Sequence, residues 1–178
     1  MTLGILDAKE HSRIIQDFDR VCSQAGIQGH FLYDSMTKYC GPTEVEWVKR
    51  FWKFKAEGLS GLALVGVNRP DTRCQAMAAA LVRNYVDARV IPVNTLIDHA
   101  MNGGTVPSPT VLLVPNLFMV ALSKSTPAWR AQIVYDILLE RSTKSKPSVV
   151  YVENMAGLKS VYGEPFRDFL SRFTAVTE

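Results

Sequence analysis

The sequence predicts an α/β fold in which helices cover both faces of a parallel β-sheet. Short apolar runs recur along the chain without the alternation of apolar and polar residues that is typical of a strand with one face in water. Helical patterns separate these runs, as the crossovers between parallel strands require. With 178 residues, of which 47% are hydrophobic and 21% are charged, the chain is long enough to bury one core.

The first part of the chain carries two helical patterns. Apolar residues at helical spacing, between charged ones, predict an amphipathic helix from Asp7 to Gln24. An irregular, glycine-punctuated connection follows. Thr43 and Glu46 then have the spacing of a capping box, which predicts a second helix that ends near Lys55.

The rest of the chain alternates between strand and helix. The sequence predicts strands at 62–65, 90–93, 110–114 and 148–152, and helices at 72–85, 95–101, 127–141 and 164–173. Glycines at positions 58 and 61 separate the first of these strands from the preceding helix, and Thr126 is the expected cap of the helix at 127–141. Pro115 and Asn116 interrupt the apolar run of the third strand.

Composition excludes several classes of protein. The longest apolar stretch, residues 110–122, is too short to span a bilayer, and the N-terminal residues lack a signal-peptide pattern, so we expect a single soluble, cytoplasmic domain. The cysteines, Cys22, Cys40 and Cys74, form no C-x-x-C pair and are expected to be reduced thiols. A net charge of +3 is compatible with nucleic-acid contact but is common in proteins without it.

The turn after the first predicted strand lies where a nucleotide-binding protein carries its phosphate loop, G-x-x-x-x-G-K-[ST]. Counted from Gly66, Asp71 takes the place of the second glycine, and with one inserted residue Arg73 and Cys74 replace the lysine and the hydroxyl. Pro70 removes one backbone N–H from the cradle, and Asp71 adds a negative charge. The degenerate loop comprises Gly66, Asp71, Thr72, Arg73 and Cys74. The alternative is an ordinary turn between a strand and a helix.

Two further positions complete the comparison with a phosphate-loop NTPase. Pro115 and Asn116 stand where acidic residues would hold Mg²⁺, and neither can neutralise a divalent cation. Asn154 ends the next strand, where a polar side chain would sense the γ-phosphate, although an asparagine there is also a common turn former. We therefore expect an NTPase-type fold that does not hydrolyse ATP and that has no catalytic residues, metal or cofactor.

The order of these segments resembles the ATPase module of bacterial replicative helicase loaders and of the related transposition helper ATPases, which belong to the AAA+ superfamily. The resemblance covers residues 24 to 173 and is carried by the segments 25–27 with Phe31 and Tyr39, 58–66, 111–114, 137–141, 153–154, 162–163 and 166–170. It implies a three-layer parallel sheet of P-loop NTPase (AAA+-like) type. From the order of the segments we expect a helical N-terminal extension and no C-terminal helical lid of the kind found in the AAA+ family.

The resemblance also implies a function. Helicase loaders grip a hexameric replicative DNA helicase through an N-terminal helical segment and help to place it on single-stranded DNA. Residues 1–24 are then the candidate partner-binding segment, and residues 25–178 form the degenerate AAA+-like domain. The apolar face of the first helix is the candidate helicase contact, with Ile14, Ile15, Phe18 and Val21. That face can equally well pack on the protein's own sheet.

Three functional hypotheses follow. The first is a replication accessory protein, from a phage or mobile element, that loads or modulates the helicase without ATP hydrolysis. The second is an inhibitor that mimics the loader, and the third is a nucleotide-dependent ATPase with an unusual loop. A homo-oligomer remains open, and no membrane partner is expected.

Contact with single-stranded DNA is a further expectation. Aromatic and basic residues interleave from Trp47 to Lys55, as in a stacking groove, although the same pattern fits a buried aromatic stripe with a solvated basic back. The candidate nucleic-acid contacts are Lys49, Arg50, Lys53, Arg69 and Arg73.

Overall fold

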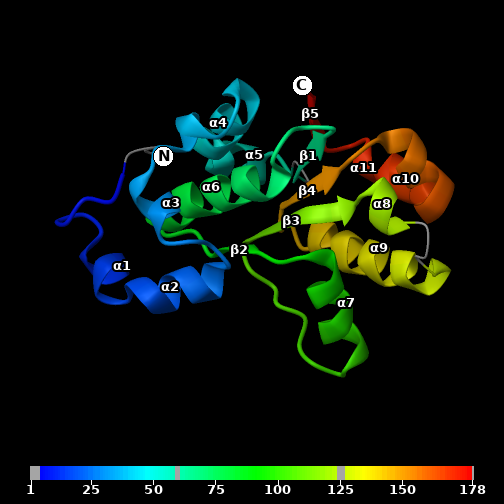
Figure 1. The fold of residues 1–178 in the computed structure, drawn as a ribbon, viewed down its shortest axis with the longest axis horizontal. Coiled ribbons are helices and arrows are strands. Elements are labelled where there is room, and N and C mark those ends of the chain that lie inside the picture. The colour runs from blue at the N-terminus through cyan, green and yellow to red at the C-terminus, as the bar shows by residue number, and fades with distance from the viewer. Residues whose placement is uncertain (1–4, 59–60, 124–126, 178) are drawn as a thin grey trace.

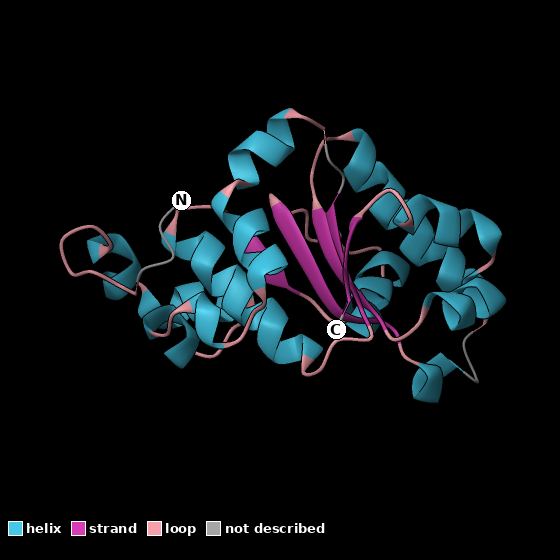
Figure 2. Ribbon diagram, turned by 90° about the horizontal axis from the view of Figure 1, so that it is seen from above, coloured by secondary structure: helices cyan, strands magenta, loops and turns pink. Residues whose placement is uncertain are grey.

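The computed structural model describes residues 5–58, 61–123 and 127–177, with the side chains of residues 122–123 not described. Five parallel strands form one sheet in the order β2-β3-β4-β1-β5. The strands are β1 (Gly61–Val65), β2 (Ala88–Val90), β3 (Val111–Phe118), β4 (Ser148–Val152) and β5 (Thr174–Thr177). Helices flank this sheet on both sides (Figures 1 and 2). The predicted α/β class with a parallel sheet is therefore confirmed.

Alternate residues of the strands divide the interior into two apolar cores. In β1, Leu62 and Leu64 face one core, and Ala63 between them faces the other. β3 and β4 follow the same alternation and are buried on both faces. Burial on both faces explains why these strands appear in the sequence as continuous apolar runs.

The first core is covered by the N-terminal helices and by the helix after β1. These are α1 (Ser12–Gln16), α2 (Phe18–Ala25), α3 (His30–Tyr33), the 3-10 helix η1 (Met36–Lys38), α4 (Pro42–Lys49), α5 (Phe51–Ala56) and α6 (Pro70–Arg83). The second core is covered by α7 (Val93–Met101), α9 (Ala128–Thr143), α10 (Met155–Tyr162) and α11 (Glu164–Leu170). A short helix, α8 (Val120–Ser123), follows β3.

The prediction of one continuous N-terminal helix from Asp7 to Gln24 is wrong. The chain bends at Asp17, which has φ −105° and ψ 27°, so that α1 and α2 are separate helices. α2 ends at Gly26 in the left-handed conformation, with φ +65°. A Cβ atom at Gly26 would lie 2.4 Å from the carbonyl oxygen of Val90, so glycine lets this end of α2 approach β2 closely.

The predicted capping box and unbroken second helix are also wrong. α4 begins at Pro42, with Gly41 as the N-cap residue, so Thr43 and Glu46 lie inside the helix. Proline suits the first helical position because its missing N–H has no partner there. Arg50, with φ −97° and ψ 16°, separates α4 from α5.

Among the strands, β4 has the predicted bounds and β3 is longer than predicted. β3 continues through Pro115 to Phe118, and its register against β4 shifts between Val114 and Phe118, because proline has no N–H to donate to the ladder. Two elements that the sequence did not predict, α10 and the edge strand β5, complete the C-terminal part. Thr126, the expected cap of α9, and residues 59–60 of the AAA+ resemblance lie outside the described residues.

Within the described ranges, none of the helices combines the length and the apolar character needed to cross a membrane. Cys22, Cys40 and Cys74 are free thiols, as predicted.

Candidate functional site

The loop that takes the place of a phosphate loop spans four residues, Gly66 to Arg69, between β1 and α6. Gly66 has φ +65°, and its N–H donates to the carbonyl oxygen of Val152 at 3.0 Å, which fixes the start of the loop against β4. Arg69 is the N-cap residue of α6 and adopts the left-handed conformation, with φ 51° and ψ 55°. Pro70 begins the helix, so the first N–H of a phosphate cradle is missing, as the sequence predicted.

The cation at the lysine position is already paired within the protein. The Nη1 atom of Arg73 lies 2.6 Å from Oε1 of Glu44 in α4. The Glu44 side chain is 1% exposed and that of Arg73 is 13% exposed. The Nε atom of Arg73 also donates to the carbonyl oxygen of Asn68 at 3.1 Å. A charge-assisted pair this well buried holds the guanidinium beneath the loop.

The other polar residues at the start of α6 also have internal partners. Asp71 accepts a hydrogen bond from Gln75 Nε2 at 2.7 Å, and Gln75 Oε1 accepts one from the backbone N–H of Gln28 at 2.9 Å. Thr72 is half-buried. The carboxylate that replaces the second glycine is therefore linked to the connection that follows α2.

Cys74, at the hydroxyl position, is fully buried, and burial raises the pKa of its thiol. Burial also raises the pKa of Cys40, whose thiol contacts the carbonyl oxygen of Arg73 at 3.7 Å, to about 12. Both thiols are therefore protonated at neutral pH.

Asn116, at the position of the Mg²⁺-binding carboxylate, caps a helix instead. Its Oδ1 atom accepts a hydrogen bond from the backbone N–H of Val93, the first residue of α7, at 2.9 Å. Pro115 beside it is buried. This side chain satisfies one of the N–H groups that a helix leaves unpaired at its start.

The two residues that follow β4 cap two other helices. Asn154 is the N-cap residue of α10, and its Oδ1 accepts from the backbone N–H of Gly157 at 2.5 Å. The preceding Glu153 accepts from the backbone N–H of Val120 in α8 at 2.7 Å. This local contact agrees with the alternative interpretation of Asn154 as a turn former.

The positions that an NTPase uses for the phosphate lysine, the Mg²⁺ carboxylate and the γ-phosphate sensor thus share the carboxyl edge of the sheet. In this protein each makes a hydrogen bond or ion pair that stabilises the fold. Within residues 5–58, 61–123 and 127–177, no group of three or more His, Cys, Asp or Glu side chains is arranged to hold a metal ion.

Sequence reasoning missed Glu44, which is 29 residues from Arg73 along the chain. The sequence does carry a signal. In the helix predicted to end near Lys55, Glu44 shares the apolar face with Trp47, Val48 and Phe51, at spacings of three, four and seven residues. A carboxylate within a buried face needs a buried cationic partner.

The candidate helicase contacts are placed mainly against the protein's own core. Ile14 is buried, and Phe18 and Val21 are partly buried and pack on the first core. Ile15 alone among the four is exposed, at 39%. The amphipathic face therefore packs on its own domain, which was the alternative interpretation.

The candidate nucleic-acid contacts do not form one group. Lys49 is exposed at the end of α4, Arg50 between α4 and α5, and Lys53 on α5. Arg69 is exposed on the loop, and Arg73 pairs with Glu44. Trp47 and Phe51 are buried, in agreement with the aromatic-stripe alternative. The sequence analysis did not single out Trp52, which is 56% exposed.

Comparison with known proteins supports the fold. No protein-family model matches the chain, and no curated protein matches it. Among solved structures, the crystal structure of a DNA replication initiation factor matches with a TM-score of 0.56 and 10% sequence identity, over 79% of this chain. The match covers 48% of that factor, so this chain spans about half its length. The three-layer α/β fold is thus similar to that of this DNA replication initiation factor.

Proposed function

We propose that this protein is a DNA-replication accessory protein that uses a AAA+-like fold as a binding scaffold and does not hydrolyse ATP. The likeness to a DNA replication initiation factor supports a role in replication. The proposed absence of ATP hydrolysis is supported by the internal contacts of Arg73, Asn116 and Asn154, which stand at the three nucleotide positions. The Arg73–Glu44 ion pair is the most important of these contacts.

Glu44 sets a free-energy cost on nucleotide binding. For Arg73 to reach a phosphate, it must leave a carboxylate that is 1% exposed. Leaving such a charge unpaired costs about 3–5 kcal/mol, which weakens nucleotide affinity by roughly two to four orders of magnitude. Asn116 cannot replace a carboxylate at Mg²⁺, so hydrolysis lacks its metal site as well.

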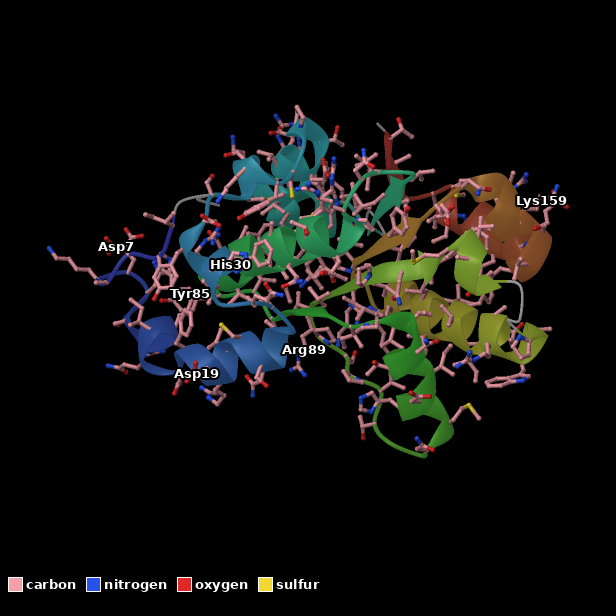
Figure 3. All side chains as sticks on the ribbon, viewed as in Figure 1. Asp7, Asp19, His30, Tyr85, Arg89 and Lys159 are labelled. Carbon is pink, nitrogen blue, oxygen red and sulfur yellow. The ribbon has the colours of Figure 1, made fainter. Side chains whose placement is uncertain are left out.

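The proposed partner is a hexameric replicative helicase, as the resemblance to helicase loaders implies. Without ATP hydrolysis, such a protein acts through different affinities for the conformations of its partner. The proposed contact surface consists of exposed, largely apolar side chains in the N-terminal segment and beside it. These side chains are Ile5, Ile15, Tyr33 and Tyr85. Tyr85 lies beside the segment that carries Asp7, and its hydroxyl donates to the carbonyl oxygen of Glu10 at 2.5 Å (Figure 3).

The test is capture of partners from host lysate by the full chain, followed by a strand-unwinding assay with the captured helicase. Recovery of a replicative helicase supports the proposal, and an increase in unwinding identifies a loader, whereas a decrease identifies an inhibitor. Recovery of a metabolic enzyme, or of nothing, contradicts it.

A matched pair of variants locates the contact. Ile15→Glu should weaken capture at least tenfold. Leu139→Glu is the control, because Leu139 is 37% exposed, close to the 39% of Ile15, but lies on α9 over the other face of the sheet. Equal capture by both variants would exclude the N-terminal surface.

A further inference from the structure

We infer that the outer surface of α4 and α5 binds single-stranded nucleic acid, with Trp52 as the residue on which a base stacks. This inference names a ligand surface within the proposed replication role, and it rests on that role for the choice of ligand. The surface comprises Trp52 and the four cations Lys49, Arg50, Lys53 and Lys55.

Trp52 presents a large aromatic surface to solvent from a fixed position. Its side chain is 56% exposed, whereas the adjacent Phe51 is completely buried. The two rings meet edge to face, with centroids 5.1 Å apart and planes at 66°. A buried neighbour therefore supports the exposed indole, which reduces the freedom that it would lose on stacking.

One cation lies against this ring, and three more are exposed close by in the chain. The Nζ atom of Lys55 lies 5.3 Å from the Trp52 centroid. Lys49 is exposed at the end of α4, Arg50 between the two helices, and Lys53 on α5. The exposed or half-buried carboxylates on α4, α5 and the residue that follows are Glu46, which pairs with Arg50, and Glu57, which lies 3.8 Å from Lys53.

These two ion pairs join residues four apart on exposed helical surface, and pairs of this kind add little stability. A phosphate can therefore replace either carboxylate. The remaining acidic residue of α4, Glu44, is buried against Arg73 and does not oppose an anion at the surface. The surface thus has an excess of positive charge.

The combination favours nucleic acid over a protein partner. Lysine is depleted at protein interfaces, whereas a basic surface with an exposed aromatic ring matches a strand whose phosphates and bases are recognised separately. It favours a single strand because the bases of a duplex are already stacked on each other and cannot stack on a side chain.

The chain provides a matched control. Trp129 on α9 is 46% exposed and also has a cation near its ring, with the guanidinium carbon of Arg130 at 5.7 Å. Within α9 no other Lys or Arg follows until Arg141, whereas Lys49, Arg50, Lys53 and Lys55 all lie within three residues of Trp52 along the chain.

The experiment measures fluorescence anisotropy of labelled 20-nucleotide oligo(dT), oligo(U) and a 20-base-pair duplex, titrated with the full chain and without helicase. We expect both single strands to bind more tightly than the duplex at low salt. Trp52→Ala should weaken single-strand binding by about 5- to 100-fold, because one base loses its stacking partner, and Trp129→Ala should leave it unchanged.

Charge reversal gives an independent readout. The Lys49→Glu/Lys53→Glu variant should reduce the slope of log affinity against log salt by about 1.4, since each phosphate contact to a single strand contributes about 0.7. The melting temperatures of all variants should stay within a few degrees of that of the parent, because the altered side chains are exposed and exposed ion pairs add little stability.

Three outcomes overturn the inference: no binding of single strands by the parent, equal affinities for Trp52→Ala and the parent, or tighter binding of the duplex. Helicase capture is measured separately, so strand binding without a helicase would contradict the proposed function alone. Capture of the helicase without strand binding would contradict this inference alone.

Discussion

Replacing Glu44 by glutamine removes the charge that faces Arg73 and keeps the size of the side chain. Arg73→Met does the reverse, leaving a carboxylate of 1% exposure without its cation. The double variant has neither charge. Together with the parent, these proteins form a double-mutant cycle on the contact that occupies the lysine position.

The structure sets the expected magnitudes. Removing one partner of a buried ion pair costs about 3–5 kcal/mol. Arg73 is 13% exposed and keeps its bond to Asn68, so we expect about 2–3 kcal/mol for Glu44→Gln and the upper range for Arg73→Met. For a chain of this size, 2–3 kcal/mol lowers the melting temperature by about 5–10 °C.

The assay is urea unfolding followed by far-ultraviolet circular dichroism, because urea, unlike guanidinium, does not screen charges. The double variant should be more stable than the sum of the single losses predicts, by about 2 kcal/mol. Single losses below about 0.5 kcal/mol, or losses that simply add, would show that the ion pair does not stabilise the loop.

Two other predictions concern the same edge of the sheet. Asn116→Ala should lower the free energy of unfolding by about 0.5–2 kcal/mol, because the α7 cap is lost. Asn116→Asp keeps an acceptor and should leave the free energy of unfolding nearly unchanged. Equal losses for the two variants in urea unfolding would exclude the capping role. For pH dependence, burial raises the pKa of Cys40 to about 12 and also raises that of Cys74, against an ordinary value of 9.0. The unfolded thiols ionise first, so the stability from these thiols is complete below pH 9 and is lost as the pH rises toward 12. Cys74→Ala should therefore reduce the fall in stability above pH 9 by about 1.4 kcal/mol per pH unit, and an unchanged slope between pH 8 and 10.5 would contradict the assignment.

Local patterns in the sequence predicted four of the five strands, with bounds that differ most at β2 and β3. β4 is a continuous apolar run because it is buried on both faces, and its predicted bounds agree with the structure. β5 has no such pattern, because it is an edge strand in which only Val176 is buried. The helices bend at Asp17 and Arg50, where the sequence has neither proline nor glycine, so no helix-breaking residue predicts these bends.

The candidate site was predictable in part. The missing lysine and carboxylates follow from the residue types alone. Their replacement contacts depend on partners that are distant along the chain, such as Glu44 for Arg73 and Val93 for Asn116, and the fold alone brings these together. Trp52 was missed because the aromatic pattern was interpreted as one stripe, whereas Trp52 lies outside the buried face.

We expect nucleotide binding to be weak because internal contacts occupy the positions from which a nucleotide would be held. Thermal unfolding of the full chain with 1 mM of a magnesium complex of a non-cleavable ATP analogue measures this binding, since a ligand that binds the native state alone raises its stability. We predict a rise in melting temperature of less than about 1 °C, as for a dissociation constant near or above 1 mM. A rise of about 5 °C or more, which corresponds to a dissociation constant near 10 μM, would contradict this expectation.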